Sequence, residues 1–346
     1  MSNRPKAVGM YSGGLDSILA VKVIMEEGFE VIALHFYTGF NGILRRDIEH
    51  GPFWKWSPEE SVIEGAQKLG INLVALDVTD DFIDILLNPR YGYGSAANPC
   101  IDCRIFTLGK ANEIMKNEGA SFVFTGEVLG QRPMSQHKNA LELVAKRSGL
   151  EGRLLRPLSA KHLDPTIPEK EGVINRDHLL NFHGRSRKPQ MELAKRFGIN
   201  WYPNAGPGCL LTDKIFAKKF KDLIDRKKES EITRLNLMSL KTGRHLRLDS
   251  GIKVIIGRTE EENNYLEELL KETCWMFETP DFPGAAVFAF DNPTEIDIKR
   301  IAAICARYGK GIGKDNISVI VTKGNTLQVL TVIPANQKDI VPYVIT

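Results

Sequence analysis

Residues 12–17, with the sequence SGGLDS, have the composition of a loop that binds phosphate. Small residues let the backbone fold tightly around an anion, and the amide groups at the start of a following helix point toward it. Ser12 and Ser17 can add hydroxyl donors. Asp16 would repel a phosphate unless it caps the helix or binds a magnesium ion. An ordinary strand-to-helix turn, capped by Asp16, is the alternative interpretation.

Three of the five cysteines stand where a thiol could take part in chemistry. Cys100 and Cys103 are separated by two residues and lead into a predicted helix, so their sulfurs can converge on one metal ion or form a redox disulfide. Cys209 follows a Gly-Pro-Gly turn, which allows its thiolate to be presented without steric cost. Cys274 and Cys305 lie in apolar stretches and are expected to pack in a core.

The sequence leaves open what the three thiols do. A [4Fe-4S] cluster on Cys100, Cys103 and Cys209 would keep one iron free for a sulfide or a substrate. A structural zinc ion would need a fourth ligand, for which His178 and His183 are candidates. In a persulfide mechanism, one cysteine would carry the transferred sulfur and another would resolve it as a disulfide.

Strands and helices alternate through the first part of the chain. Runs rich in β-branched and aromatic residues predict strands, and capped or periodic segments predict helices. This alternation predicts an α/β fold with a doubly wound parallel sheet, whose ligands bind at the carboxyl ends of the strands. The predicted strands are residues 7–11, 29–36, 72–78 and 121–125, and the predicted helices are residues 18–27, 57–69, 79–87 and 103–117.

Two long loops, residues 38–57 and 91–99, are expected at the same end of the sheet as the phosphate loop. Long loops at this edge are often functional. Aromatic side chains that only cover apolar surface are the alternative interpretation.

The last hundred residues predict a smaller α+β domain, after a boundary between about 229 and 241. Before it, a helix over residues 214–228 carries seven basic residues against two acidic ones and would face either RNA phosphates or solvent. The C-terminal domain is expected to have a hairpin, two helices and three further strands: residues 246–248 with 253–257, 260–271, 285–290, 294–308, 318–322 and 328–334.

Length and composition set the outer limits. The chain of 346 residues suits two domains, and no stretch approaches the length of apolar sequence that a membrane helix needs. With no signal-peptide core after its first residues, a cytoplasmic protein that does not bind membranes is expected. A net charge of +3 is too small to argue for nucleic acid by itself. Five cysteines are too few and too unevenly placed for a disulfide framework.

The phosphate loop resembles the SGGxDS loop of the PP-loop ATP pyrophosphatases, which bind ATP, transfer AMP to an oxygen and release pyrophosphate. Residues 125–131, TGEVLGQ, resemble the TGExLGQ segment of tRNA 4-thiouridine synthases, and residues 156–158 resemble the RPL segment that follows it. Over roughly residues 5–225, the resemblance implies a PP-loop fold of the adenine nucleotide alpha hydrolase type and a tRNA-thiolating activity, in which ATP adenylates a uridine carbonyl oxygen and sulfur displaces AMP.

This resemblance also implies the cofactors and the site residues. The cysteine pattern is similar to that of the cluster-dependent tRNA thiolases, which implies Cys100, Cys103 and Cys209 as ligands of a [4Fe-4S] cluster. Asp16 would help to bind Mg²⁺ beside ATP. The residues implied to line the ATP site are Ser12, Gly13, Gly14, Asp16, Ser17, His35, Phe36, Gly126, Glu127 and Gln131.

The C-terminal residues resemble the NFACT-type RNA-binding module, although Glu278 and Ala286 stand where that module is expected to have histidines. This likeness implies a grip on tRNA phosphates by Arg244, His245, Arg247 and Arg258. A structural module with scattered surface arginines is the alternative. The expected domains are therefore a PP-loop catalytic domain over 1–230 and an RNA-binding domain over 241–346.

The sequence thus predicts an ATP-dependent tRNA sulfurtransferase that is supplied by a sulfur donor, either sulfide or a protein persulfide. The 4-carbonyl of uridine is preferred over the 2-carbonyl. The alternatives are a persulfide route without a cluster, or an ATP-dependent amide or amidine ligase. The oligomeric state is not predicted.

Overall fold

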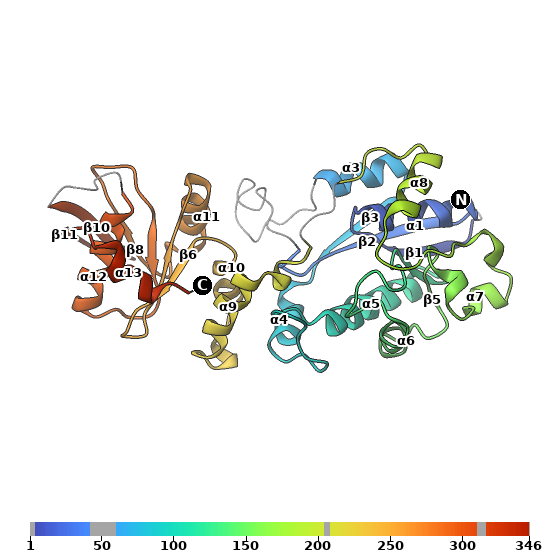
Figure 1. The fold of residues 1–346 in the computed structure, drawn as a ribbon, viewed down its shortest axis with the longest axis horizontal. Coiled ribbons are helices and arrows are strands. Elements are labelled where there is room, and N and C mark those ends of the chain that lie inside the picture. The colour runs from blue at the N-terminus through green and yellow to red at the C-terminus, as the bar shows by residue number, and fades with distance from the viewer. Residues whose placement is uncertain (1–3, 42–59, 204–207, 310–315, 346) are drawn as a thin grey trace. The chain divides into compact units, whose positions relative to one another are not determined.

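The computed structural model describes residues 4–41, 60–203, 208–309 and 316–345. They form two compact units, the first ending at Cys209 and the second beginning at Leu210 (Figure 1). Most of the expected loop at 38–57, the start of the expected helix at 57–69 and most of the Gly-Pro-Gly turn before Cys209 lie outside the described residues. The domain boundary expected between about 229 and 241 stays a prediction.

Unit 1 contains a five-stranded sheet in which every pairing is parallel. Its central strand is also the first in the chain, with β2 on one side and β4 on the other. The predicted doubly wound α/β fold is therefore confirmed. In spatial order the strands are β3 (Asn72–Asp77), β2 (Glu30–Tyr37), β1 (Lys6–Met10), β4 (Val123–Thr125) and β5 (Leu154–Leu155).

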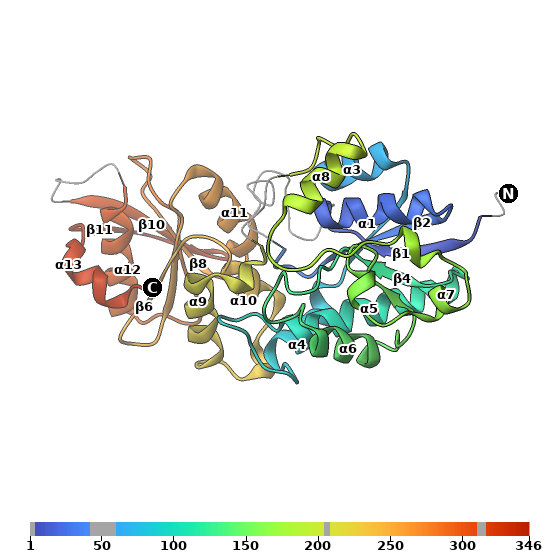
Figure 2. The ribbon, with the colours of Figure 1, turned by 45° about the vertical axis from the view of Figure 1, so that its right-hand side comes forward.

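Helices cover both faces of this sheet because its strands are apolar on both sides. Two separate cores result, one on each face. Figures 1 and 2 show α1, α3 and α8 on one face and α4, α5 and α6 on the other. The helices are α1 (Leu15–Glu26), α3 (Glu60–Leu69), α4 (Thr79–Leu87), α5 (Cys100–Asn117), α6 (Lys138–Arg147), α7 (Ile167–Lys170) and α8 (Lys188–Arg196), with 3₁₀ turns η2 (Ala160–His162) and η3 (Arg176–His178).

The strand order reverses beside β1, and this places the phosphate loop. The chain leaves β1 toward β2 and β3, and returns later to add β4 and β5 on the other side. Met10, the last residue of β1, pairs with Leu34 of β2 and Thr125 of β4. Residues 12–17 therefore leave the sheet at a topological switch point, where open α/β sheets bind ligands.

One predicted helix begins earlier than expected. Helix α5 starts at Cys100 and not at Cys103, so both cysteines lie within its first turn. Pro99 directly precedes the helix, and its fixed φ and missing amide hydrogen suit a helix start.

Unit 2 is built on a six-stranded antiparallel sheet with a core on each face. Cys274 and Cys305 are buried in these cores, as the sequence predicts. The sequence analysis missed β8. The strands in spatial order are β11 (Thr326–Val332), β10 (Ile317–Lys323), β8 (Trp275–Glu278), β9 (Val287–Ala289), β7 (Lys253–Ile256) and β6 (Arg244–Arg247). The helices are α9 (Lys214–Ile224), α10 (Arg234–Ser239), α11 (Glu260–Leu270), α12 (Glu295–Arg307) and α13 (Gln337–Ile340), with 3₁₀ turns η4 (Leu210–Thr212), η5 (Glu229–Glu231) and η6 (Val341–Tyr343).

The basic helix α9 belongs to unit 2, and one of its cations does not face solvent. Lys219 is buried and donates hydrogen bonds from Nζ to the carbonyl oxygens of Leu240 (3.3 Å) and Gly243 (3.1 Å). Burial lowers the pKa of Lys219 to about 8, and Arg258 and Lys253 add to this effect. Lys219 therefore stabilises unit 2 internally and is unavailable to RNA.

Within the part of the chain that the structure describes, no helix combines the length and the apolar composition required to cross a membrane.

Candidate active site

The phosphate loop is closed by its own serines. Ser17 donates a hydrogen bond to the carbonyl oxygen of Gly14 at 2.8 Å, and the Ser12 hydroxyl lies 3.3 Å from the Ser17 hydroxyl. Gly13 has a φ of 72°, a conformation that glycine adopts without strain. Ser17 is buried, so its hydroxyl shapes the loop, whereas Ser12 is exposed at the edge.

Asp16 lies in the first turn of α1, where its carboxylate is only partly used. Its Oδ2 accepts a hydrogen bond from Gln131 Nε2 at 3.1 Å. Its Oδ1 is buried and has no hydrogen-bond partner among the described residues. A carboxylate oxygen without a partner, beside a loop of anion-binding type, fits a hard cation such as Mg²⁺.

Gly126 contacts the phosphate loop so closely that a side chain has no room. A Cβ atom at this position would lie 2.5 Å from the carbonyl carbon and oxygen of Asp16 and 2.7 Å from the amide nitrogen of Ser17. The loop after β4 therefore packs directly against the start of α1. Gly126 and Gln131 thus lie at the edge where the sequence predicts them.

His35 and Phe36 are buried in β2. His35 Nδ1 is hydrogen-bonded to the carbonyl oxygen of Tyr11 at 3.0 Å, so this ring holds the residue that enters the phosphate loop. Burial lowers the pKa of His35, against an opposing effect of the bond to Tyr11, and favours a neutral ring. Phe36 packs in the core on the α5 face. Their assignment to the adenosine stays a prediction.

Glu127 is buried within a group of charges that links β4, β5 and α5. Its Oε2 accepts from Arg156 Nε at 3.1 Å, and its Oε1 lies 3.5 Å from Arg104 Nε. Burial alone would raise the pKa of Glu127, but Arg104 and Arg156 outweigh it and hold the pKa below its ordinary value. The Glu127 carboxylate therefore forms ion pairs with two arginines, and through Arg104 it connects the carboxyl edge of the sheet with helix α5, which begins at Cys100.

Cys100 is the first residue of α5 and is partly exposed. Asn98 Nδ2 donates a hydrogen bond to the Cys100 sulfur at 3.1 Å and also lies 3.7 Å from the sulfur of Met134. Met134 follows Gln131 by three residues, and Gln131 contacts Asp16. The loop after β4 therefore contacts both the phosphate loop and the side chain that is hydrogen-bonded to this thiol.

The other two thiols of unit 1 lie near Cys100 but are held differently. Burial raises the pKa of the Cys103 thiol to about 12; Arg104 opposes this, and Cys209 and Cys100 add to it. Cys209 donates from Sγ to the carbonyl oxygen of Phe40 at 3.3 Å. The structure therefore brings the three cysteines of the sequence prediction into one neighbourhood, with different environments.

The described residues give no support for the predicted cluster. Cys103 is partly exposed, and its surroundings raise the pKa of its thiol. Among the described residues there is no group of three or more histidine, cysteine, aspartate or glutamate side chains that could hold a metal ion. His178, a suggested zinc ligand, is hydrogen-bonded to Glu27 at 2.6 Å instead. We therefore derive no step through iron or zinc.

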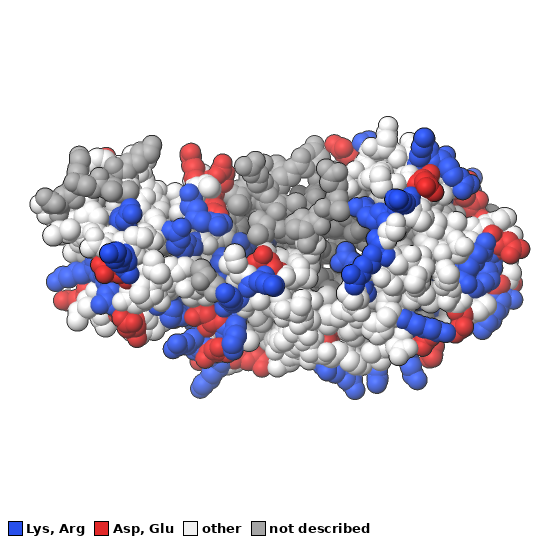
Figure 3. Space-filling view, viewed as in Figure 1, with Lys and Arg blue, Asp and Glu red and all other residues white. Residues whose placement is uncertain are grey.

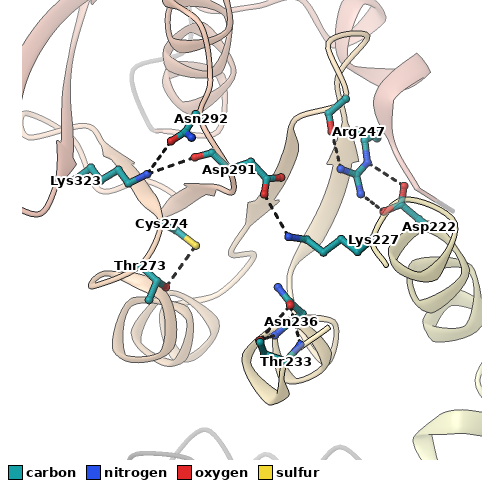
Figure 4. A network of polar contacts seen from close by, with 11 residues as sticks. Asp222, Lys227, Thr233, Asn236, Arg247, Thr273, Cys274, Asp291, Asn292 and Lys323 are labelled. Atoms are coloured by element: carbon teal, nitrogen blue, oxygen red, sulfur yellow. Dashed lines mark hydrogen bonds and ion pairs between the residues drawn. The ribbon is translucent and has the colours of Figure 1, made fainter. Parts of the chain in front are cut away.

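The arginines expected to grip RNA in unit 2 are largely engaged within the protein. Arg247 pairs with Asp222 at 2.6 Å (Figure 4). Arg258 pairs with Glu262. His245 is completely enclosed, and burial, together with the nearby lysines Lys219 and Lys253, holds its pKa well below the ordinary value.

Arg244 lies over the ring of Tyr308 at 4.9 Å. A partly open cavity of about 320 Å³ adjoins the pair of Arg247 and Asp222, with Lys227 and Asp291 also on its wall. The placement of these cations explains how the module holds its shape, and their contact with RNA stays a prediction.

Sequence reasoning missed three residues of the site. Arg156 was noted only as part of a motif, and Arg104 and Asn98 were not singled out. A weak signal existed for Arg156, because it follows the short apolar strand β5 at the carboxyl edge of the sheet. Arg104 and Asn98 owe their roles to contacts that only the folded chain forms.

Comparisons with known proteins agree with the two-part architecture. Residues 6–148 match the family model described as tRNA methyl transferase HUP domain, and residues 243–344 match the NFACT protein RNA binding domain. These matches confirm the expected PP-loop type of fold and the resemblance of the C-terminal module.

The curated relatives are similar to part of the chain. The tRNA-specific 2-thiouridylase MnmA of Petrotoga mobilis is 23% identical over 233 residues, which are 64% of this chain and 59% of that protein. The Bradyrhizobium sp. protein of the same name is 25% identical over 200 residues, 56% of this chain and 46% of the relative. That of Acetivibrio thermocellus is 32% identical over 134 residues, 36% of each. The chain spans about half the length of these relatives, or less.

Proposed function

We propose that this protein is an ATP-dependent tRNA sulfurtransferase that adenylates a uridine carbonyl oxygen and then replaces this oxygen by sulfur carried on a cysteine. The observation that carries the proposal is that the loop after β4 contacts both the phosphate loop and the residues around Cys100. Gly126 and Gln131 contact the phosphate loop. Glu127 pairs with Arg104 of α5, and Met134 lies 3.7 Å from Asn98, which donates to the Cys100 sulfur. Activation and sulfur transfer can then occur at one edge of the sheet.

Activation is assigned to the phosphate loop and Asp16. The uridine oxygen attacks the α-phosphorus of ATP and pyrophosphate leaves, which turns a poor leaving group into AMP. The amide groups at the start of α1 suit the phosphates, and the free Oδ1 of Asp16 suits the magnesium ion that accompanies them. Gly126 allows the strand edge to approach this loop.

Sulfur transfer is assigned to Cys100. A donor of the persulfide class, or sulfide with an oxidant, gives a Cys100 persulfide. Its terminal sulfur attacks the activated carbon and AMP leaves with the former carbonyl oxygen. A second thiolate then attacks the Cys100 sulfur, which releases the thiolated uridine and leaves a disulfide that an external thiol reduces. Cys209 is the proposed second thiol, because it lies in the same neighbourhood but outside helix α5, whereas the surroundings of Cys103 raise the pKa of that thiol.

The 2-carbonyl now replaces the 4-carbonyl as the proposed position. The sequence prediction relied on the TGExLGQ likeness, whereas the curated relatives that are similar to this chain are described as 2-thiouridylases. The chain also contains an NFACT-type module. The proposed substrate is therefore given only as a class, a uridine of a tRNA.

The test is thiolation of an unmodified tRNA transcript with ATP, Mg²⁺ and a persulfide donor, followed by mass spectrometry of the nucleosides. We expect 2-thiouridine, with at least a hundredfold loss in Cys100→Ser and little loss in Cys274→Ala, whose thiol lies in the core of unit 2. In the Cys103→Ser protein, the disulfide formed during turnover should join Cys100 to Cys209.

Three results would contradict the proposal. If only protein purified without oxygen and containing iron and sulfide is active, the cluster route of the sequence prediction replaces the persulfide route. A tRNA without thiolated nucleosides, together with AMP formation on a carboxylate acceptor, would indicate a ligase. The appearance of 4-thiouridine alone would restore the original choice of carbonyl.

A further inference from the structure

A basic segment of unit 1, unassigned so far, is fastened to the strand edge beside the phosphate loop. Residues 180–184 run along two other loops of this edge. Leu180 donates its amide to the Pro157 carbonyl oxygen at 2.9 Å, and Phe182 donates to Leu158 at 2.7 Å. The chain then reaches the loop after β4, where Gly184 donates to the Leu129 carbonyl oxygen at 2.7 Å.

This attachment fixes where the next residues lie. His183 forms an isolated parallel bridge with Leu129, and a Cβ on Gly130 would lie 3.2 Å from His183 Nε2. Residues 185–188 therefore begin beside the loop after β4, and Gln131 of this loop contacts Asp16 of the phosphate loop.

Four cations belong to the two chain segments that meet here, and we call them the edge cations: Arg132, Arg185, Arg187 and Lys188. Arg132, Arg185 and Lys188 are exposed, and Arg187 is half-buried. In Figure 3, a band of lysine and arginine side chains runs across unit 1 beside α8.

Among the described residues, the edge cations have no acidic partners, in contrast to Arg156 and Arg176. Arg156 pairs with Glu127, and Arg176 pairs with Glu169 at 2.5 Å. Between the edge cations and the carboxylates of the described residues, by contrast, there is no ion pair. Cations kept unpaired beside a catalytic edge are suited to an external anion.

We propose that the edge cations bind the RNA phosphates that flank the target uridine. A uridine within RNA carries a phosphate on each side, so a base that enters this edge brings two phosphates to its rim. The phosphates of ATP already have the amide groups of residues 12–17. Since the arginines of unit 2 are largely engaged with carboxylates, unit 1 needs its own RNA contacts. The inference depends on the proposed function in one respect only, namely that the RNA is a tRNA.

The test measures the affinity of the full chain for an unmodified tRNA transcript over a series of salt concentrations. Each phosphate contact contributes about 0.9 to the slope of log affinity against log salt. We expect the Arg185→Gln/Arg187→Gln protein to lose about two from this slope and to bind the transcript about tenfold more weakly at low salt. Arg132→Gln, in the loop after β4, should lose about one.

The matched control is Lys195→Gln/Arg196→Gln, which removes two exposed cations from the far end of α8. It should leave the slope unchanged, and ATP affinity should be unchanged in all variants. An unchanged slope in Arg185→Gln/Arg187→Gln, or an equal loss in the control, overturns the inference. A loss of ATP affinity instead would assign the cations to the nucleotide. If tRNA binds as expected but is never thiolated, the proposed function fails and this inference stands.

Discussion

The contact between Gly126 and the phosphate loop makes a single methyl group a test of the site. In Gly126→Ala the new Cβ would lie 2.5 Å from the carbonyl carbon and oxygen of Asp16. Carbon atoms in ordinary contact are about 3.5–4.0 Å apart. Because the atoms in conflict belong to the backbone, no side-chain rotation can relieve the overlap, and the two loops must separate by about 1 Å.

The separation would displace the residues that hold ATP. A shift of about 1 Å in a catalytic arrangement can lower the rate about 100-fold. This corresponds to roughly 3 kcal/mol in activation free energy. The same overlap is expected to lower the free energy of unfolding by about 1–3 kcal/mol.

The assay is tRNA-dependent pyrophosphate release, from which kcat/KM for ATP is obtained, with thermal unfolding measured on the same samples. Gly109→Ala is the control, because it adds the same methyl group within α5 where no atom lies within 4 Å. This control should keep full activity and gain up to about 1 kcal/mol in stability.

The reasoning is refuted if Gly126→Ala is folded and its kcat/KM lies within threefold of the wild-type value. Complete loss of cooperative unfolding would refute it too, since the overlap would then be relieved in β4 and not in the loop.

Three further predictions concern single residues. Gly14→Ala adds a Cβ whose nearest neighbour, Ser12 Oγ, is 3.4 Å away, so the melting temperature should hardly change. The affinity for ATP should fall, because the new methyl group occupies space that the phosphates need. Equilibrium binding of ATP measures this affinity. Asp16→Asn keeps the shape of the side chain but removes its charge, and a magnesium titration of pyrophosphate release should show at least a tenfold weaker apparent affinity. Lys219 has a pKa of about 8 against 10.5 for an ordinary lysine, so between pH 8 and 10.5 the unfolded chain binds more protons than the folded chain. The contribution of Lys219 to the free energy of unfolding therefore rises over this range, by up to about 3 kcal/mol. Chemical denaturation of Lys219→Met should lack this rise.

The parts of the site that could be predicted from the sequence are those formed by neighbours in the chain. Residues 12–17 carry their own signal, because a turn rich in glycine and serine between a strand and a helix needs no distant partner to be recognised. The placement of Gly126 at the same edge was implied by the resemblance of residues 125–131, and in the structure Gly126 packs against Asp16 and Ser17.

The parts that could not be predicted depend on contacts across the sheet. Glu127 was expected to line the ATP site, but its carboxylate is shared between Arg104, 23 positions earlier, and Arg156, 29 positions later. This sharing requires β5 to lie beside β4 and α5 to lie over the same edge, which no local pattern encodes. The expected cluster gains no support among the described residues, and cysteine spacing alone does not report the surroundings of each thiol.

The central place of β1 has a consequence for how the chain is made. This strand leaves the ribosome before the other four strands of its sheet, yet it completes its pairing only when β4 appears, more than 110 residues later. At the usual pace of synthesis this delay is on the order of 10 s. During that time β1 has one neighbour and one open edge, so unit 1 is exposed to mispairing for longer than its short strands suggest. Both chaperone dependence and the effect of slow codons should therefore be greatest between β2 and β4.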